Sequence, residues 1–228
     1  MFKPGDIVQR MQIEKQLLEG CRRLAGKGFL NSPADSFSMR IPGKMEIILA
    51  SRQDDWRKIE IADLRTASFF SQEGLCGLHA SIYRERADAG AVVISSSKGA
   101  RLLARFGGLL PPVFDEQVRH IGSNATPLPD EKYAQCDMVR KTFKRGANAA
   151  LLGERLLCLG MTCDRVLFNT ELYEKCAQAY VIAKASGNQI GFIPVWVRLI
   201  ANHRLLRDER HAAECYRNGC IPENTNSY

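Results

Sequence analysis

Apolar and polar positions along the chain follow a helical period near the N-terminus and a strand period after it. Residues 6–25 place apolar side chains on one stripe with charges opposite, which predicts a helix capped by Asp6 after a Pro4-Gly5 break. Apolar residues then alternate with polar ones in three short runs separated by turn residues such as Pro42 and Gly43. Short connections between strands favour an antiparallel sheet. The three strands are expected at residues 36–41, 45–50 and 56–64.

The middle of the chain predicts a helix at residues 75–90, a buried strand at 91–97 and a second helix at 98–106. A strand end that opens onto a helix is where α/β proteins usually place reactive groups. Here that strand end carries Ile94, Ser95, Ser96 and Ser97.

The second half of the chain predicts more helices around one hairpin. Helices on either side of strands indicate an α/β domain with a central, mainly antiparallel sheet covered by helices. The expected elements are a Gly/Pro-rich linker at 106–117, an extended piece at 118–128, a helix at 130–145 starting at Pro129-Asp130, a hairpin at 149–160 turning at 153–155, a helix at 163–185 capped near Gly187 and Asn188, a helix at 194–215 and a frayed tail at 218–228.

Composition indicates an ordinary globular chain. It has 228 residues, of which 45% are hydrophobic and 25% charged, enough for one domain or one domain with an extension. No apolar run approaches the roughly 20 residues of a membrane span, and the charged start lacks a signal-peptide core. We therefore expect a cytoplasmic protein. The eight cysteines form no C-x-x-C pair and are expected to be reduced core residues.

The net charge of +7 fits anionic partners, such as phosphorylated metabolites. Basic residues near the C-terminus, however, alternate with acidic ones, and no nucleic-acid reader motif is present. A solvated helix face is therefore favoured over a nucleic-acid patch, and neither nucleic acid nor membrane is an expected partner. The residues concerned are Arg204, Arg207, Arg210 and Arg217, with Asp208, Glu209 and Glu214 among them.

One motif points to a known family. His79, Ile82 and Tyr83 form H-x-x-I-Y on the predicted helix, and Ala91-Val92-Val93 begins the next strand. This combination resembles the class II aldolase/adducin family, in which the strand reads A-V-V-H-T-H and its two histidines bind the metal. The similarity covers roughly residues 6–187 and implies that family's three-layer fold, with helices on both faces of the sheet. We expect residues 1–190 to form this domain and residues 191–228 to be its C-terminal helical extension and tail.

The resemblance also suggests where an anion would bind. The family's first strand carries G-N-x-S-x-R, which matches Asp35 to Arg40 and retains Ser38 and Arg40, although Asp35 would repel an anion. Ser38 and Arg40 fit strand alternation with an exposed basic residue equally well. The loop after the next strand offers Ser51 and Arg52, which also fit an ordinary polar loop.

The positions that correspond to the family's catalytic residues have changed together. Ile94 and Ser96 stand at the two strand histidines, and Leu75 stands at the acid/base glutamate. Counting back from Glu171 and Glu174, which resemble the family's E-x-L-E, puts Glu154 at the third metal histidine. Leucine transfers no proton, and a catalytic zinc needs about three protein ligands. The expectation is therefore a degenerate site without zinc or another cofactor.

Two functions remain open on this pattern. The first is a metal-free binding or assembly module, which forms a homo-oligomer, possibly a tetramer as the resemblance implies, and could bind a small anionic ligand. The second is a lyase that cleaves a small phosphorylated or carboxylated sugar-like substrate by altered chemistry. Ser95, Ser96, Ser97 and Lys98 would then bind the anion at a helix N-terminus, although Ser97 and its neighbours also fit a simple helix cap. A weak zinc pattern, H-x3-C-x4-C, is formed by His211, Cys215 and Cys220.

Overall fold

The computed structural model of the chain describes residues 4–51, 53–72, 74–123, 125–129, 136–143, 146–187 and 189–223. Twelve helices and strands and three single turns of helix follow one another along these residues. In chain order they are α1 (Pro4–Gly26), β1 (Ser36–Arg40), β2 (Glu46–Ser51), η1 (Trp56–Lys58), η2 (Ile61–Asp63), β3 (Arg65–Ser68), α2 (Gly74–Glu85), β4 (Ala91–Ser95), α3 (Lys98–Arg105), η3 (Gln117–Ile121), α4 (Cys136–Thr142), β5 (Ala149–Leu152), β6 (Arg155–Gly160), α5 (Cys163–Ala185) and α6 (Val195–Arg217).

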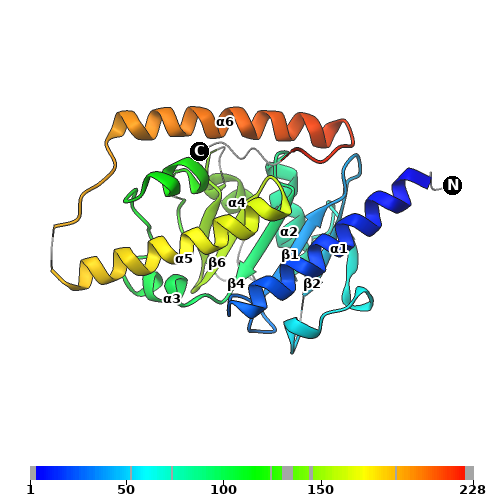
Figure 1. Cartoon of the computed structure of the whole chain (residues 1–228), viewed down its shortest axis with the longest axis horizontal. Helices are drawn as coiled ribbons and strands as arrows, with labels where there is room; N and C mark the ends of the chain where they lie inside the picture. Colours follow the sequence, from blue (N-terminus) through cyan, green and yellow to red (C-terminus); the bar gives the residue numbers. More distant parts are fainter. Residues whose placement is uncertain are drawn as a thin grey trace.

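The strands form one sheet in the order β3-β2-β1-β4-β6-β5, and all neighbouring strands are antiparallel. Alternate side chains of each strand point to opposite faces, so each face has its own apolar core. Phe37 and Val93 pack with α1, α3 and α5 on one face, whereas Val92 and Ile94 pack with α2 and α4 on the other (Figure 1). This confirms the predicted α/β fold, with a mainly antiparallel sheet between two layers of helices.

Helix α6 crosses the molecule outside these layers (Figure 1) and is attached at its C-terminal half. The Tyr216 hydroxyl donates to the Met161 carbonyl at 2.7 Å, and the Gly43 amide donates to the Tyr216 carbonyl at 3.2 Å. Within the described part of the chain, no helix has both the length and the apolar character that a membrane span requires.

Two predicted extended segments are wrong, because short helical turns with a few buried apolar side chains can show the same alternation of apolar and polar residues as a strand. Residues 56–64 form η1 and η2 instead: Asp55 caps η1, and Glu60 and Asp63 form a capping box on η2. Trp56 is buried as an anchor, with its indole donating to the Ser32 carbonyl at 3.0 Å. The third strand is β3, which follows directly. Similarly, residues 118–128 contain η3 and two isolated bridges rather than an extended piece.

The observed start of α1 differs from the predicted one, and two other predicted helix ends fall on residues that the structure does not describe. Helix α1 begins at Pro4, so Asp6 lies inside it rather than at its cap; proline suits the first turn because it needs no amide donor there. Helix α4 is observed from Cys136, and its expected start at Asp130 lies outside the described residues, as does Asn188 after α5. The hairpin at 149–160 and the helix at 163–185 are confirmed.

Candidate functional site

The candidate site is the region beside α2 where β1 begins and β2 and β4 end. The sheet register places Ser36 of β1 directly opposite Ser51 of β2 and Ile94 of β4. Ile94 in turn pairs with Leu157 of β6, next to the β5–β6 turn that carries Glu154. The chain therefore brings the three positions that the resemblance assigns to metal ligands to the same end of the sheet.

These positions do not offer a zinc-binding set. Ile94 is fully buried and belongs to the apolar core under α2 and α4, and Leu75 is a half-buried neighbour of the same core. The Ser96 hydroxyl is half-buried and donates to Asp35 Oδ1 at 2.6 Å. Glu154 is exposed in the hairpin turn. One carboxylate and one engaged hydroxyl do not match the three or four nitrogen, sulfur or carboxylate ligands of a zinc site.

Asp35 holds the loop before β1 rather than facing a ligand. Its Oδ2 atom accepts the backbone amides of Asn31 at 2.8 Å and Ser32 at 2.9 Å. Burial raises the pKa of this carboxyl, against hydrogen bonds from Ser96 and the two amides that lower it. The Ser96 hydroxyl, which the resemblance places at a metal-ligand position, therefore stabilises a buried loop.

The serine run at the end of β4 is also occupied by internal contacts. The Ser95 hydroxyl donates to the Phe29 carbonyl at 3.0 Å, and Ser97 is the N-cap of α3, accepting from the Ala100 amide. The Gly99 amide donates to both carboxylate oxygens of Glu174, at 2.9 and 2.8 Å. An anionic side chain of the protein thus already lies at the N-terminus of α3, where the alternative lyase would bind its substrate anion. Lys98 remains exposed.

The candidates on β1 form a buried polar network with α2. The hydroxyls of Ser36 and Ser38 lie 2.8 and 2.7 Å from the two ring nitrogens of His79. The Ser38 hydroxyl also lies 2.9 Å from the Tyr83 hydroxyl, which donates to the Ser38 carbonyl. Burial lowers the pKa of His79 to about 3, so the imidazole is neutral. The network joins the strand to the helix and leaves Ser38 no access to a ligand.

Arg40 is not the exposed basic residue that alternation suggested. Its guanidinium donates to the carbonyls of Ala89, Tyr83 and Arg86, at 2.8, 2.9 and 2.9 Å. It also lies within 5.0 to 5.4 Å of three aromatic ring centres, those of Phe69, Tyr83 and Tyr216. Burial is the main cause that lowers the pKa of this group. Of the other anion-binding candidates, Ser51 is half-buried at the end of β2, and Arg52 lies outside the described residues.

A buried ionic cluster, which the sequence did not indicate, attaches α6 to the core. Arg86 Nη2 lies 2.6 Å from Asp88 and 2.9 Å from Glu209, and Glu209 also accepts the Gly146 amide. Nearby, Arg119 pairs with Asp208 at 2.7 Å. Asp208 and Glu209 are therefore core residues rather than part of a solvated face. Since Arg86 and Glu209 are 123 positions apart, no local sequence pattern could have linked them.

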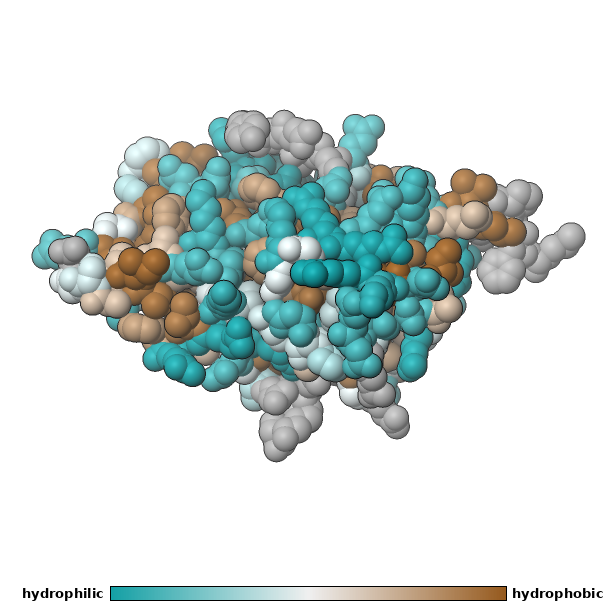
Figure 2. All heavy atoms as spheres, turned by 60° about the horizontal axis from the view of Figure 1, so that its bottom comes forward, coloured by the Kyte–Doolittle hydropathy of each residue, from teal (hydrophilic) through white to brown (hydrophobic). Residues whose placement is uncertain are grey.

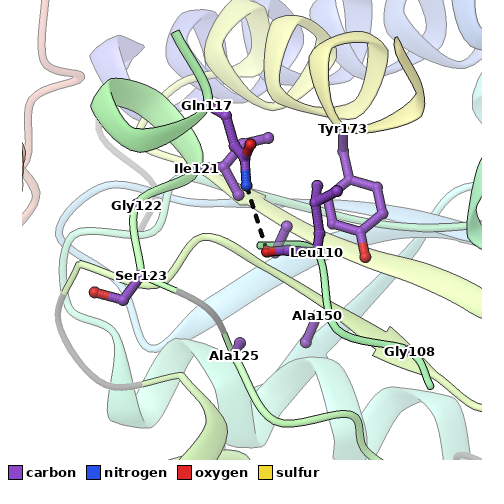
Figure 3. Close-up of a pocket in the computed structure, with 10 residues that line it drawn as sticks. Gly108, Leu110, Gln117, Ile121, Gly122, Ser123, Ala125, Ala150 and Tyr173 are labelled. Atoms are coloured by element: carbon purple, nitrogen blue, oxygen red, sulfur yellow. Dashed lines mark hydrogen bonds between the residues drawn. The ribbon is translucent and has the colours of Figure 1, made fainter. Parts of the chain in front are cut away.

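Two hollows lie away from this end of the sheet. A cavity between η3, β5 and α5, lined by Gln117, Ile121 and Tyr173, has a volume of about 10 Å³, the space of a single water (Figure 3). An open groove of about 800 Å³ lies between α1 and the β2–β3 edge, with Ile7, Met11 and Met45 among its walls. Among the described residues no three metal-binding side chains come together, so His211, Cys215 and Cys220 do not form the ligand set that their spacing suggested.

Comparison with known proteins identifies the family. The family model of the class II aldolase and adducin N-terminal domain matches residues 15–181. The L-fuculose 1-phosphate aldolase from Glaciozyma antarctica PI12 superposes with a TM-score of 0.73 at 15% identity, over 96% of this chain and 93% of that one. YgbL from Escherichia coli, a putative aldolase/epimerase/decarboxylase, gives 0.70 at 16% identity, over 86% and 99%. No curated protein matches the sequence. At these identities the structures establish the fold, and the family model establishes that the chain belongs to the class II aldolase and adducin family.

Proposed function

We propose that this chain is a member of the family with a degenerate metal site, which serves as a binding or assembly module rather than as a metal-dependent aldolase. The observation that carries the proposal is Ile94, which is fully buried in the apolar core at the first metal position. A side chain in that place fills the space of a ligand and provides no donor atom. The Ser96–Asp35 hydrogen bond, which uses the second position for loop structure, supports the same conclusion.

The exposed apolar surface supports assembly with further copies of the chain. Apolar residues gather at both ends of the face in Figure 2, near the start of α1 and around the α5–α6 connection. Soluble proteins rarely expose large apolar patches unless they bind a partner there. The α5–α6 surface consists of six side chains that are 50 to 69% exposed: Ile182, Phe192, Val195, Trp196, Leu199 and Ile200.

The size of the α5–α6 surface fits a protein interface. An aromatic side chain can bury about 150–250 Å², so the exposed parts of Phe192 and Trp196 alone offer on the order of 250 Å², and the four aliphatic side chains add to this area. A stable interface buries about 800 Å² on each partner. Neighbouring polar residues would supply the remainder, so a second copy of the chain is a suitable occupant.

The net charge of +7 supports a small anionic ligand as a further partner. The alternative function, a lyase of altered chemistry, needs a free anion site at the end of β4. The Glu174 carboxylate already accepts the hydrogen bond of the Gly99 amide there, so no observation on this loop favours the lyase.

An aldol-cleavage assay tests the proposal. The purified chain is incubated with L-fuculose 1-phosphate, with and without added zinc, and the carbonyl products are followed. We expect no turnover above the uncatalysed rate in either condition. Zinc-dependent cleavage would overturn the proposal. Sedimentation analysis of the same sample is expected to give a homo-oligomer, and a monomer at micromolar concentration would contradict the assembly role.

A further inference from the structure

The C-terminal end of α6 brings two cysteines together by its backbone geometry. Asn218 is the C-cap, and Gly219 follows in the left-handed region with φ of 78°. The Cys220 amide donates to the Cys215 carbonyl at 3.0 Å, and the Gly219 amide donates to the Tyr216 carbonyl at 3.2 Å. These two bonds define a Schellman motif, in which the side chains of the residues corresponding to Cys215 and Cys220 normally make an apolar contact. In this chain both contacting residues are cysteines.

The side chains of this pair are close and accessible. The Cys220 thiol lies 3.2 Å from the Cys215 carbonyl, and His211 Nε2 lies 3.7 Å from the Cys215 sulfur, one helical turn away. Cys220 is exposed and Cys215 is half-buried, whereas Cys21, Cys158, Cys163 and Cys176 are buried. Burial and the hydrogen bond with Cys220 raise the pKa of the Cys215 thiol. Because Cys220 is the more exposed of the two, it is the first thiol that a reagent meets.

We propose that Cys215 and Cys220 are a reversible thiol–disulfide site, oxidised by a low-molecular-weight disulfide such as glutathione disulfide. The Cys220 thiolate attacks one sulfur of that disulfide, which breaks the S–S bond, forms a mixed disulfide and releases one thiolate. The Cys215 thiolate then attacks the Cys220 sulfur, forms the intramolecular S–S bond and releases the second thiolate. The protein loses two electrons and two protons, and the reagent becomes two thiols. His211 is placed to accept the Cys215 proton.

The disulfide would fasten the tail to the body of the protein. Directly after Cys220, Ile221 packs against the core on the α1 and α5 side, and Pro222 is buried. The side-chain amide of Gln9 (Nε2) donates to the Gly219 carbonyl at 3.0 Å, so the same turn also contacts α1. Closing the ring from 215 to 220 would fix this arrangement covalently, whereas in the reduced chain, where both thiols are free, hydrogen bonds and packing alone hold it.

Peptide mapping of the whole protein tests the site. The native chain is incubated with glutathione disulfide, its remaining thiols are blocked with iodoacetamide, and it is digested with trypsin without reductant. Cleavage after Arg210 and Arg217 puts Cys215 and Cys220 on separate peptides, 211–217 and 218–228. We expect these peptides to appear joined, lighter by two hydrogen atoms than their sum, and to separate with dithiothreitol. Recovery of both cysteines alkylated, as stable glutathione adducts, or in a disulfide between two chains would overturn the proposal.

A glycine variant separates the helix-end geometry from mere proximity along the chain. Gly219→Val places a β-branched residue at a φ of 78°, which strains the turn although the nearest atom that its Cβ would meet, the Gly43 Cα, is 4.0 Å away. The joined peptides are expected to fall several-fold, with a rise in the glutathione adduct of Cys220. Gly187→Val, which strains the equivalent turn after α5 at φ of 73°, is the matched control and should leave the yield unchanged. Equal yields in both variants would contradict the role of the motif.

Discussion

The His79 imidazole makes stability depend on pH in a way that one substitution tests. Its ring is fully buried and hydrogen-bonded at both nitrogens to serine hydroxyls, and no carboxylate of the described residues hydrogen-bonds to it. Burial lowers its pKa from 6.5 to about 3. A buried imidazolium would keep two donors but would have no compensating negative charge.

The folded state therefore binds fewer protons than the unfolded state between pH 3 and 6.5. The contribution of neutral His79 to the unfolding free energy is therefore fully present above pH 6.5 and is lost progressively as the pH falls toward 3. A pH of 5.0 is about 1.5 units below the pKa of histidine in the unfolded chain, and each unit of difference is worth about 1.4 kcal/mol of unfolding free energy. His79 alone should thus cost about 2 kcal/mol of unfolding free energy between pH 7.5 and 5.0.

Urea unfolding of the wild type and of His79→Gln at these two pH values measures this contribution. The variant should be less stable at pH 7.5, because glutamine fits the two serines imperfectly, but its loss on acidification should be smaller by about 2 kcal/mol. His203→Gln, at an exposed position on α6, should keep the wild-type pH dependence. Equal acid losses in wild type and His79→Gln would refute the reasoning.

Three further substitutions test other parts of the structure. Arg86→Met leaves the carboxylate of Glu209 buried without its cation, and should lower the unfolding free energy by about 3–5 kcal/mol in urea denaturation; a loss below about 1 kcal/mol would contradict this. Glu174→Gln replaces the charged acceptor at the first turn of α3 with a neutral one, and should lower the unfolding free energy by about 1 kcal/mol in the same assay, with an unchanged value as the opposing result. Trp196→Asp should shift sedimentation toward smaller species, whereas Ile61→Asp, at an equally exposed position elsewhere, should not; the same shift in both would argue against the α5–α6 surface.

Local patterns predicted most of the fold, because periodicity and capping act over a few residues. The sequence predicts both ends of helix α5, and the structure adds the Thr162 N-cap at its start and a left-handed Gly187 after its last turn. The run at 56–64 misled because Ile59 and Ile61 alternate as they would in a strand, but only Ile59 is buried, and Ile61 is 63% exposed at the start of η2.

The sequence could predict that metal ligands are missing from the candidate site, but it could not predict which contacts the substituted side chains make instead. The resemblance predicts that Ile94 and Ser96 stand at ligand positions. That Ile94 would pack into the core, and that Ser96 would reach Asp35 across 61 positions, depends on the sheet register. Likewise, Arg40 resembled a surface residue because alternation says nothing about the aromatic rings that other segments bring to it.

Zinc binding by the purified full-length chain tests the central claim most directly. The protein is dialysed against excess zinc, then against zinc-free buffer, and its metal content is measured by plasma mass spectrometry. Because Ile94, Ser96 and Glu154 do not form a ligand set, we predict far less than one zinc per chain. One retained zinc per chain would contradict the account, and its loss in a Glu154→Ala variant would place that zinc at the family position.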